Sequence, residues 1–324
     1  MLRRAGFTTS EEPFEYSAFP GSWATPTAGI VAATAAIAFY LGRTLPVLIA
    51  PSLVALIAAL LFLANVGRRG VLTSRLMRRR GVNLQAVRGV VEPTVWLVAH
   101  VDSKWQPVSM IARVVGIIGT TLGLVASIVL ALSANRGAGG VAALVLLLTW
   151  LFSIPVILSV VGDRNDGTLD NASGVAAVLE AAESLPPTAR VGVLITDAEE
   201  LGLAGARAWA LSREPGVAIN CDSVDDIGRV VAMYSGARPT KLLSLAQSAA
   251  ERQGESLRVM RLIPGILTDS VALADAGWTT LTLSRGELRT LRRIHTSRDR
   301  LDAMGGTGIA GVAGIMVRMA TELG

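Results

Sequence analysis

Four long stretches that are almost free of charged side chains constrain this chain most. They cover residues 25–41, 45–66, 108–132 and 139–161, and only Arg113 interrupts them. Each stretch reaches, or nearly reaches, the roughly 20 residues that an α-helix needs to cross the hydrocarbon core of a bilayer. Buried helices of soluble proteins seldom run this far without a charged edge. We therefore expect four transmembrane helices, arranged as two hairpins.

The composition fits a chain that is partly membrane-embedded and partly soluble. Of its 324 residues 51% are hydrophobic, and the mean hydropathy is +0.51. These values are too apolar for a single soluble domain and too polar for a pure membrane bundle. The net charge is +5, but the arginines cluster beside the apolar stretches, so we attribute them to membrane topology and expect no nucleic-acid partner. The single cysteine, Cys221, permits no intrachain disulfide, and we expect it to be a small buried residue.

The basic residues near the ends of the apolar stretches divide unevenly between two sides. One side has Arg3, Arg4, six arginines within 68–80, Lys104 and Arg164, whereas the other has Arg43 and Arg136. Positive charge favours the cytoplasmic side of a membrane. We therefore expect a multi-pass protein of the cell membrane with both termini and the soluble part in the cytoplasm.

These features divide the chain into five segments. We expect a loose N-terminal tail at 1–24, a first transmembrane hairpin at 25–66, the start of a soluble domain with a basic juxtamembrane segment at 67–106, a second, inserted hairpin at 107–162, and the remainder of the soluble domain, with most of its functional site, at 163–324.

The soluble segments alternate short apolar strands with amphipathic helices. Strands are predicted at 94–99, 190–196, 217–221, 230–234 and 279–283. Helices are predicted at 173–185, 201–212, 241–253, 270–276 and 307–323. This alternation is typical of an α/β domain whose sheet is covered by helices on both faces.

Histidines and carboxylates stand at the ends of these strands and in neighbouring loops. The set comprises His100, Asp102, Asp170, Glu199, Glu200, Asp222 and His295, and it contains both histidines of the chain. Imidazole nitrogens and carboxylate oxygens at successive strand ends are ligands that a divalent metal needs. The sequence thus predicts a metal site.

A site for two metal ions needs a shared carboxylate, terminal ligands for each ion, and a base. We assign His100 and Asp222 to one ion, Glu200 and His295 to the other, and Asp170 to both. Glu199 is expected to point away from Glu200, because adjacent side chains diverge in an extended chain, and to act as general base. Asp102 lies two residues after His100 and is expected to accept the second ring N–H and fix its tautomer.

Five blocks that contain these residues resemble, in the same order, the motifs of the di-zinc aminopeptidases of metallopeptidase family 28 (clan MH). The blocks are Ala-His-Val-Asp-Ser at 99–103, Asp-Asn-Ala-Ser-Gly-Val at 170–175, Asp-Ala-Glu-Glu-Leu-Gly-Leu at 197–203, Asn-Cys-Asp at 220–222 and His-Thr-Ser-Arg-Asp at 295–299. The resemblance covers residues 94–102 and 163–302 and leaves the four apolar stretches outside it. The family joins its first two blocks by a short loop, whereas here the second hairpin intervenes.

The resemblance implies a three-layer αβα zinc-peptidase-like domain with a mostly parallel, mixed sheet. It implies two Zn²⁺ ions, an attacking water that bridges them, and a cis peptide bond after Asp170. The function it implies is a membrane-integral, zinc-dependent aminopeptidase that removes N-terminal residues from peptides, with a peptide substrate and the lipid bilayer as partners.

Two other functions fit parts of the sequence. A glutaminyl cyclase is similar in fold, binds one zinc and also carries a block like His100-Val-Asp-Ser-Lys104. A membrane scaffold that keeps the fold without activity is the other, although such relatives typically lose ligands and none is lost here. Asp269, Asp275 and Asp299 are expected to be caps or surface residues rather than ligands.

Overall fold

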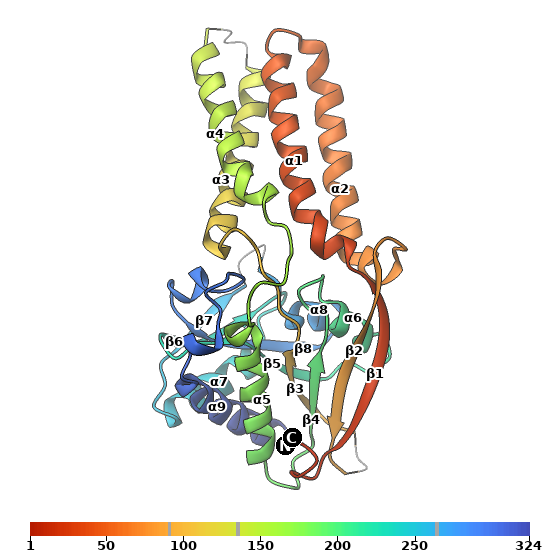
Figure 1. Ribbon diagram of the computed structural model, residues 1–324, viewed down its shortest axis with the longest axis vertical. Coiled ribbons are helices and arrows are strands. Elements are labelled where there is room, and N and C mark those ends of the chain that lie inside the picture. Colours follow the sequence, from red (N-terminus) through yellow and green to blue (C-terminus); the bar gives the residue numbers. More distant parts are fainter. Residues whose placement is uncertain (90–91, 134–136, 263–265) are drawn as a thin grey trace. The chain divides into compact units, whose positions relative to one another are not determined.

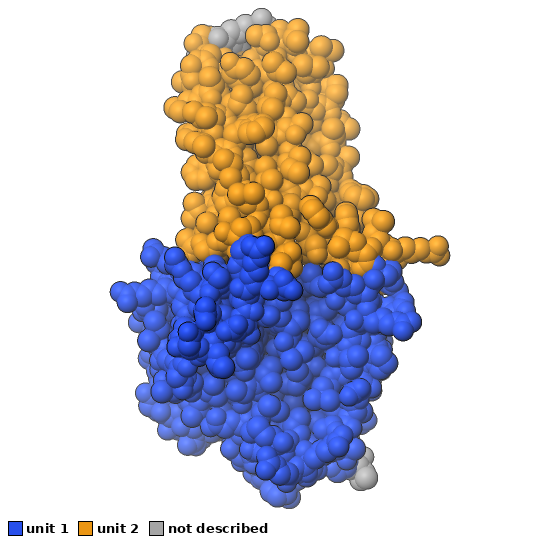
Figure 2. All heavy atoms as spheres, viewed as in Figure 1, with its two compact units in different colours: residues 1–16, 78–105, 163–324 blue, residues 17–77, 106–162 orange. Residues whose placement is uncertain are grey.

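The computed structural model describes residues 1–89, 92–133, 137–262 and 266–324, and the side chain of Arg68 is outside this description. The chain divides into two compact units, coloured separately in Figure 2. Unit 1 comprises Met1–Tyr16, Arg78–Trp105 and Asp163–Gly324, and unit 2 comprises Ser17–Met77 and Gln106–Gly162. Each unit is therefore assembled from segments that are separated in the sequence.

Unit 1 is built on one sheet, which has eight strands in the described part of the chain. The strands are β1 (Thr8–Ser17), β2 (Arg78–Val87), β3 (Val95–His100), β4 (Val191–Thr196), β5 (Val217–Val224), β6 (Arg229–Tyr234), β7 (Leu257–Arg261) and β8 (Thr279–Gly286), in the spatial order β1-β2-β4-β3-β5-β8-β6-β7. The pairs β3–β4, β3–β5, β5–β8 and β6–β7 are parallel, whereas β2–β4 and β6–β8 are antiparallel. The expected mostly parallel, mixed sheet is confirmed.

Helices cover both faces of this sheet (Figure 1). The helices of unit 1 are α5 (Ser173–Ser184), α6 (Ala204–Ala210), α7 (Thr240–Arg252), α8 (Asp269–Asp275) and α9 (Thr307–Leu323). Side chains of α5, α7 and α9 share one apolar core, and those of α6 and α8 share a second core that contains Trp96, Trp209 and Trp278. The domain is therefore a three-layer αβα domain, as the sequence predicts.

The central strand β3 shows why this sequence forms the middle of the sheet. All six of its residues are buried, and they alternate between the two cores: Leu97 and Ala99 face one, whereas Trp96 and Val98 face the other. Side chains of a strand alternate between its faces, so a strand buried on both faces has a continuous apolar sequence. This strand ends at His100.

The expectation of a loose N-terminal tail is wrong for most of residues 1–24. Thr8–Ser17 forms the edge strand β1, and a helix already begins at Phe19. The charged face of an edge strand meets solvent, so a sequence with three glutamates resembles a polar tail. Glu15 pairs with Arg78 of β2 at 3.0 Å, and Phe7 is buried in the core.

Two other strands, β2 and β7, were not predicted from the sequence for a similar reason. Strand β2 lies in the segment that we interpreted only as a basic anchor, and Arg78 and Arg80 on it both approach Glu15 of β1. Strand β7 forms the opposite edge of the sheet and exposes Arg258 and Arg261. Charged residues on the exposed faces of strands at or next to the edges of the sheet thus obscured the apolar pattern of a strand.

Unit 2 contains four helices that are long and apolar enough to cross a membrane, in the described part of the chain. They are α1 (Phe19–Gly42), α2 (Ile49–Thr73) with the short 3₁₀ turn η1 (Pro46–Leu48) before it, α3 (Met110–Leu132) and α4 (Gly139–Ile157). Helix α1 packs against the other three, and α3 packs against α4.

Small residues allow α3 and α4 to approach closely. A Cβ atom added at Gly119 would lie 2.2 Å from the ring of Phe152, and one at Gly123 would lie 2.2 Å from Thr149 Oγ1. Helices in membranes associate through such close packing, because lipid removes most of the hydrophobic driving force between them.

Candidate active site

The candidate site lies at the carboxyl ends of the central parallel strands of unit 1. His100 ends β3 and is in register with Thr196, the last residue of β4. Glu199 and Glu200 follow β4 by a few residues, and Asp222 belongs to the adjacent strand β5. Because parallel strands end at one edge of the sheet, residues far apart in the sequence meet there.

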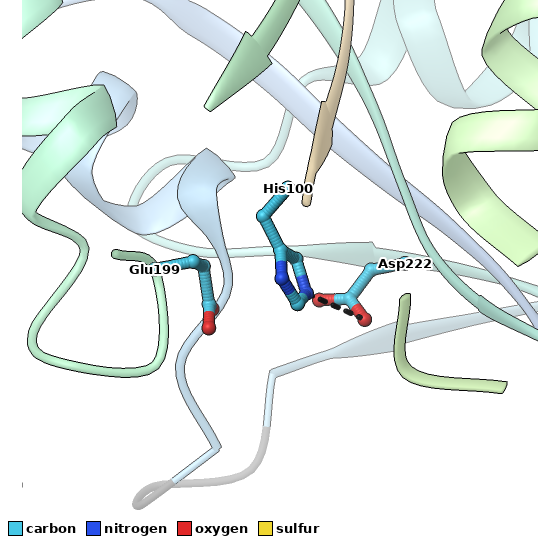
Figure 3. Close-up of side chains that lie close together, drawn as sticks. All are labelled: His100, Glu199 and Asp222. Atoms are coloured by element: carbon cyan, nitrogen blue, oxygen red, sulfur yellow. Dashed lines mark ion pairs between the residues drawn. The ribbon is translucent and has the colours of Figure 1, made fainter. Parts of the chain in front are cut away.

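His100, Glu199 and Asp222 form a first group of side chains that could hold a metal ion. One ligand atom from each lies within 4.8 Å of the others, and all three residues are buried. In Figure 3 the His100 ring lies between the carboxylates of Glu199 and Asp222, and its Nε2 is 3.8 Å from Asp222 Oδ1.

Asp170, Glu200 and His295 form a second group with the same spacing and burial. His295 Nε2 lies 2.9 Å from Asp170 Oδ2 and 2.9 Å from Glu200 Oε1. Glu200 Oε1 is buried and, apart from this contact with His295, has no polar partner among the described residues. An imidazole nitrogen and two carboxylate oxygens thus converge here, which suits a divalent metal.

Asp170 also faces the first group. Its Oδ1 lies 3.2 Å from His100 Nε2, whereas its Oδ2 approaches His295. Each oxygen of one carboxylate is therefore directed at a different histidine, as a carboxylate shared by two ions would be. The peptide bond between Asp170 and Asn171 is cis, as the resemblance implies.

The carboxylate of Asp102 has a different contact from the one expected. It accepts hydrogen bonds from the backbone N–H groups of Glu199 (2.9 Å) and Glu200 (3.1 Å). His100 Nδ1 is 3.0 Å from the backbone carbonyl oxygen of Asp102 but 3.6 Å from its carboxylate, too far for a hydrogen bond. The main-chain carbonyl of Asp102 therefore orients the His100 ring, and the side chain of Asp102 orients the Glu199–Glu200 turn.

Two further residues fix the segment around Asp170. The buried carboxylate of Asp299 accepts the N–H groups of Leu169 (2.6 Å) and Asp170 (3.1 Å). The amide of Asn171 donates to the carbonyl of Cys221 (3.0 Å) and accepts from the N–H of Ser223 (3.0 Å). Asp299 is thus a cap, as expected, and its position four residues after His295 was the signal for its place in the site.

Lys104 is a member of the site that the sequence reasoning did not assign to it. Its buried ammonium contacts Glu200 Oε2, which leaves Glu200 Oε1 directed at His295. Burial by itself would raise the pKa of Glu200, but the charges of His295 and Lys104 lower it to about 2. The only signal in the sequence was its place in the block 100–104.

Glu199 and Asp170 have pKa values shifted in opposite directions. Burial raises the pKa of Glu199 well above its ordinary value, and the charge of His100 opposes this only in part. Burial would also raise the pKa of Asp170, but hydrogen bonds with His100 and His295 hold it below its usual range. Glu199 therefore binds a proton more readily than an ordinary glutamate, whereas Asp170 stays ionised.

Asp269 carries a further buried carboxylate near His100 and is therefore not a surface residue. It is the first residue of α8 and is fully buried, and the hydroxyl of Thr196 donates to it. Burial raises its pKa to about 7. Asp275, in contrast, is exposed, as expected. Cys221 is buried, also as expected, and burial raises its pKa.

The residues present fit a pair of divalent ions. Two groups of three nitrogen and oxygen donors are buried, and Asp170 faces both. Such a buried donor set at the carboxyl ends of parallel strands suits a metal-dependent hydrolase.

A family model described as peptidase family M28 matches residues 85–320, which is most of the chain. The chain therefore belongs to peptidase family M28, and zinc is the metal that this membership implies. None of the curated proteins matches the chain.

Several solved structures are similar to this one. The aminopeptidase from Aneurinibacillus sp. strain AM-1 is 16% identical, with 76% of this chain and 50% of that chain covered and a TM-score of 0.49. The LapA aminopeptidase from Legionella pneumophila is 16% identical, with 75% and 54% covered and a TM-score of 0.49. The glutaminyl cyclase from Porphyromonas gingivalis is 17% identical, with 75% and 77% covered and a TM-score of 0.49. This chain spans about half the length of the two aminopeptidases.

Proposed function

We propose that this protein is a membrane-integral, zinc-dependent aminopeptidase that holds two zinc ions. His100 and Asp222 would bind one ion, Glu200 and His295 the other, and Asp170 both. The observation that carries the proposal is the position of Asp170, whose two carboxylate oxygens lie 3.2 Å from His100 and 2.9 Å from His295. Zinc bound there would polarise the scissile carbonyl and lower the pKa of a water molecule.

Glu199 has the properties of the general base. Its buried carboxylate lies beside His100, and its raised pKa favours proton uptake. In the proposed reaction Glu199 accepts a proton from the attacking water and returns it to the nitrogen of the leaving amine. A carboxylate with a raised pKa is a stronger base than an ordinary glutamate, which suits both proton transfers. Asp102 assists as a positioning residue, because it holds the backbone of the Glu199–Glu200 turn.

The experiment is metal analysis of the purified full-length chain, combined with a panel of aminoacyl reporter substrates. We expect about two zinc ions per chain and release of the reporter, both abolished by a chelator and restored by zinc. Protein that turns over substrate with no more than trace metal would contradict the proposal.

A glutaminyl cyclase is the second candidate, because glutaminyl cyclases carry a block similar to His100-Val-Asp-Ser-Lys104. It needs one zinc and would form pyroglutamate from an N-terminal glutamine. A stoichiometry of one, with cyclisation of a glutaminyl peptide and no reporter release, would favour it. Protein that binds zinc but performs neither reaction would favour the scaffold.

We also propose that both termini and unit 1 are cytoplasmic. The support is the excess of basic residues on that side, although Arg136 and the side chain of Arg68 lie outside the described residues. Arg43, which follows α1, donates to the carbonyl of Ala138, which precedes α4, at 2.8 Å, so the end of α1 and the start of α4 lie at the same end of unit 2.

Cysteine labelling tests this topology. Leu45 and Lys241 are exposed, and the native Cys221 is buried. In intact cells an impermeant thiol reagent should modify Leu45→Cys and leave Lys241→Cys unmodified. The opposite pattern would invert the proposed orientation.

A further inference from the structure

The loop that carries His295 is unusually rich in arginine. Residues 285–300 include Arg285, Arg289, Arg292, Arg293, Arg298 and Arg300. Four of them have a carboxylate partner: Arg285 pairs with Glu255 (2.5 Å), Arg289 with Glu287 (3.6 Å), Arg293 with Asp225 (3.1 Å) and Arg300 with Asp302 (3.2 Å).

Arg292 and Arg298 differ from these four. Both are exposed, and neither forms an ion pair or a side-chain hydrogen bond with the described part of the chain. They lie three residues before and three residues after His295, so each is at most about 10 Å along the backbone from a proposed metal ligand. The two arginines without partners are therefore the two that flank that ligand symmetrically.

The remainder of the loop is held in place. Ile294 and His295 are buried, Arg293 is tied to the buried Asp225, and Asp299 is tied to the backbone of Asp170. These contacts fix the loop on both sides of His295. Arg292 and Arg298 thus project from a backbone whose position relative to the site is set.

The position of the loop suits the carboxyl end of a substrate. In the proposed aminopeptidase the amino end of the peptide lies at the metal site, and its carboxyl end extends away from that site. The nearby unpaired guanidinium groups favour an anionic group, and guanidinium binds carboxylate in a planar, two-pronged geometry. A peptide carboxylate two or three residues beyond the scissile bond is about 7–10 Å from it, within the same range.

We propose that Arg292 and Arg298 bind the C-terminal carboxylate of the substrate, so that the site selects short peptides with a free carboxyl end. This inference rests on the proposed aminopeptidase function. It names a substrate class, tri- and tetrapeptides, and two specificity-determining residues.

The test compares Leu-Gly-Gly with its C-terminal amide. The parent protein, purified in detergent with zinc, should have a kcat/KM about 5- to 10-fold higher for the free acid, because two exposed charge-assisted contacts each contribute modestly. In Arg292→Gln/Arg298→Gln this ratio should fall to near 1. Added salt should reduce the ratio of the parent in the same direction, because these charges are exposed.

Arg289→Gln is the matched control, since Arg289 is an exposed arginine of the same loop that already has Glu287 as a partner. It should keep the preference of the parent. Equal kcat/KM for acid and amide in the parent would overturn the inference while leaving the aminopeptidase function in place, whereas no hydrolysis of either peptide would contradict that function itself. A double variant that keeps the preference but loses a dependence on anionic lipid in nanodiscs would overturn the inference in favour of a membrane-surface role.

Discussion

Units 1 and 2 differ in which side chains they bury and which they expose. Unit 1 buries charged groups such as Asp170, Glu199 and Asp222, whereas unit 2 leaves large apolar side chains such as Phe62 (63% exposed) and Leu122 (65% exposed) on its surface. In water the first arrangement costs free energy and the second forfeits hydrophobic stabilisation. The buried charged groups of unit 1 are those of the candidate active site, and the exposed apolar side chains of unit 2 suit an apolar solvent.

The source of stability should therefore differ between the units. In unit 1, two apolar cores lie on the two faces of the sheet, so burial of apolar area contributes most. In unit 2, where lipid would surround the exposed side chains, close packing of α3 against α4 at Gly119 and Gly123 contributes more. Four substitutions probe this contrast.

The largest effect is expected from Glu199→Gln in unit 1. The substitution keeps the shape of the side chain but removes its capacity to accept a proton, so kcat should fall by at least about 10²–10⁴-fold. Zinc content and the thermal transition should stay close to those of the parent. Glu183→Gln is the control, because Glu183 is an exposed glutamate of α5. Near-parental turnover in Glu199→Gln would remove Glu199 as the base.

Asp102→Asn should have the next largest effect, on metal affinity. Its two carboxylate oxygens accept one backbone N–H each, from Glu199 and from Glu200, whereas an asparagine amide offers only one acceptor oxygen. Loss of such a supporting contact typically weakens metal binding about 10–100-fold. Competition with a chelator measures the affinity, and Asp163→Asn, at an exposed aspartate, should leave it unchanged. Parental affinity in Asp102→Asn would show that the turn does not depend on this contact.

Gly123→Ala tests the packing of unit 2. The added methyl group would lie 2.2 Å from Thr149 Oγ1, and overpacking of this kind costs about 1–3 kcal/mol. The control is Gly67→Ala in α2, where an added Cβ would meet no atom within 4 Å. That change should be neutral or slightly stabilising, because alanine favours a helix over glycine. Thermal unfolding in detergent compares the two, and equal transitions would contradict close α3–α4 packing.

The smallest effect is expected from Asp226→Ala in unit 1. Asp226 accepts hydrogen bonds from Gly305 N (2.7 Å) and Gly308 N (3.3 Å) at the start of α9. Removal of a helix cap typically costs about 1 kcal/mol in the free energy of unfolding. Burial alone would raise the pKa of Asp226, but the backbone N–H groups lower it overall.

The sign of the pH dependence follows from this lowered pKa. A carboxylate with a lowered pKa in the folded state contributes stability above its unfolded pKa and loses it as the pH falls through the folded value. The difference between the parent and Asp226→Ala should thus be full at neutral pH and shrink below about pH 4. A difference that grew at low pH would contradict the assigned contacts.

The sequence allowed the centre of unit 1 to be predicted better than its edges. Strands β3, β4 and β5 are buried on both faces, so their apolar runs are unambiguous, and the polar residues that end them mark the site. Strands β1, β2 and β7 carry charged residues on exposed faces, which removes that signal.

The contacts within the site were harder to predict than its members. His100, Glu199 and Asp222 come together as one group and Asp170, Glu200 and His295 as another, but the assignment of each residue to an ion stays a proposal. The side chain of Asp102 was assigned to the wrong partner, because spacing along a strand gives the side of the sheet and not the nearest donor. The burial of Lys104 depends on segments distant in sequence, which no local pattern encodes.

The order of the strands in the sheet also affects how this chain can fold while the ribosome synthesises it. Strand β3 sits between β4 and β5, yet α3 and α4 are synthesised between β3 and both of its neighbours. Strand β3 therefore cannot pair with β4 or β5 until α3 and α4 have been synthesised. During this interval the apolar strand β3 can form non-native pairs, which is a hazard of sheets built from segments distant in sequence. Of the side chains in the candidate site that could hold a metal ion, His295 comes last in the sequence, so a nascent chain acquires the complete set only after residue 295 has been synthesised.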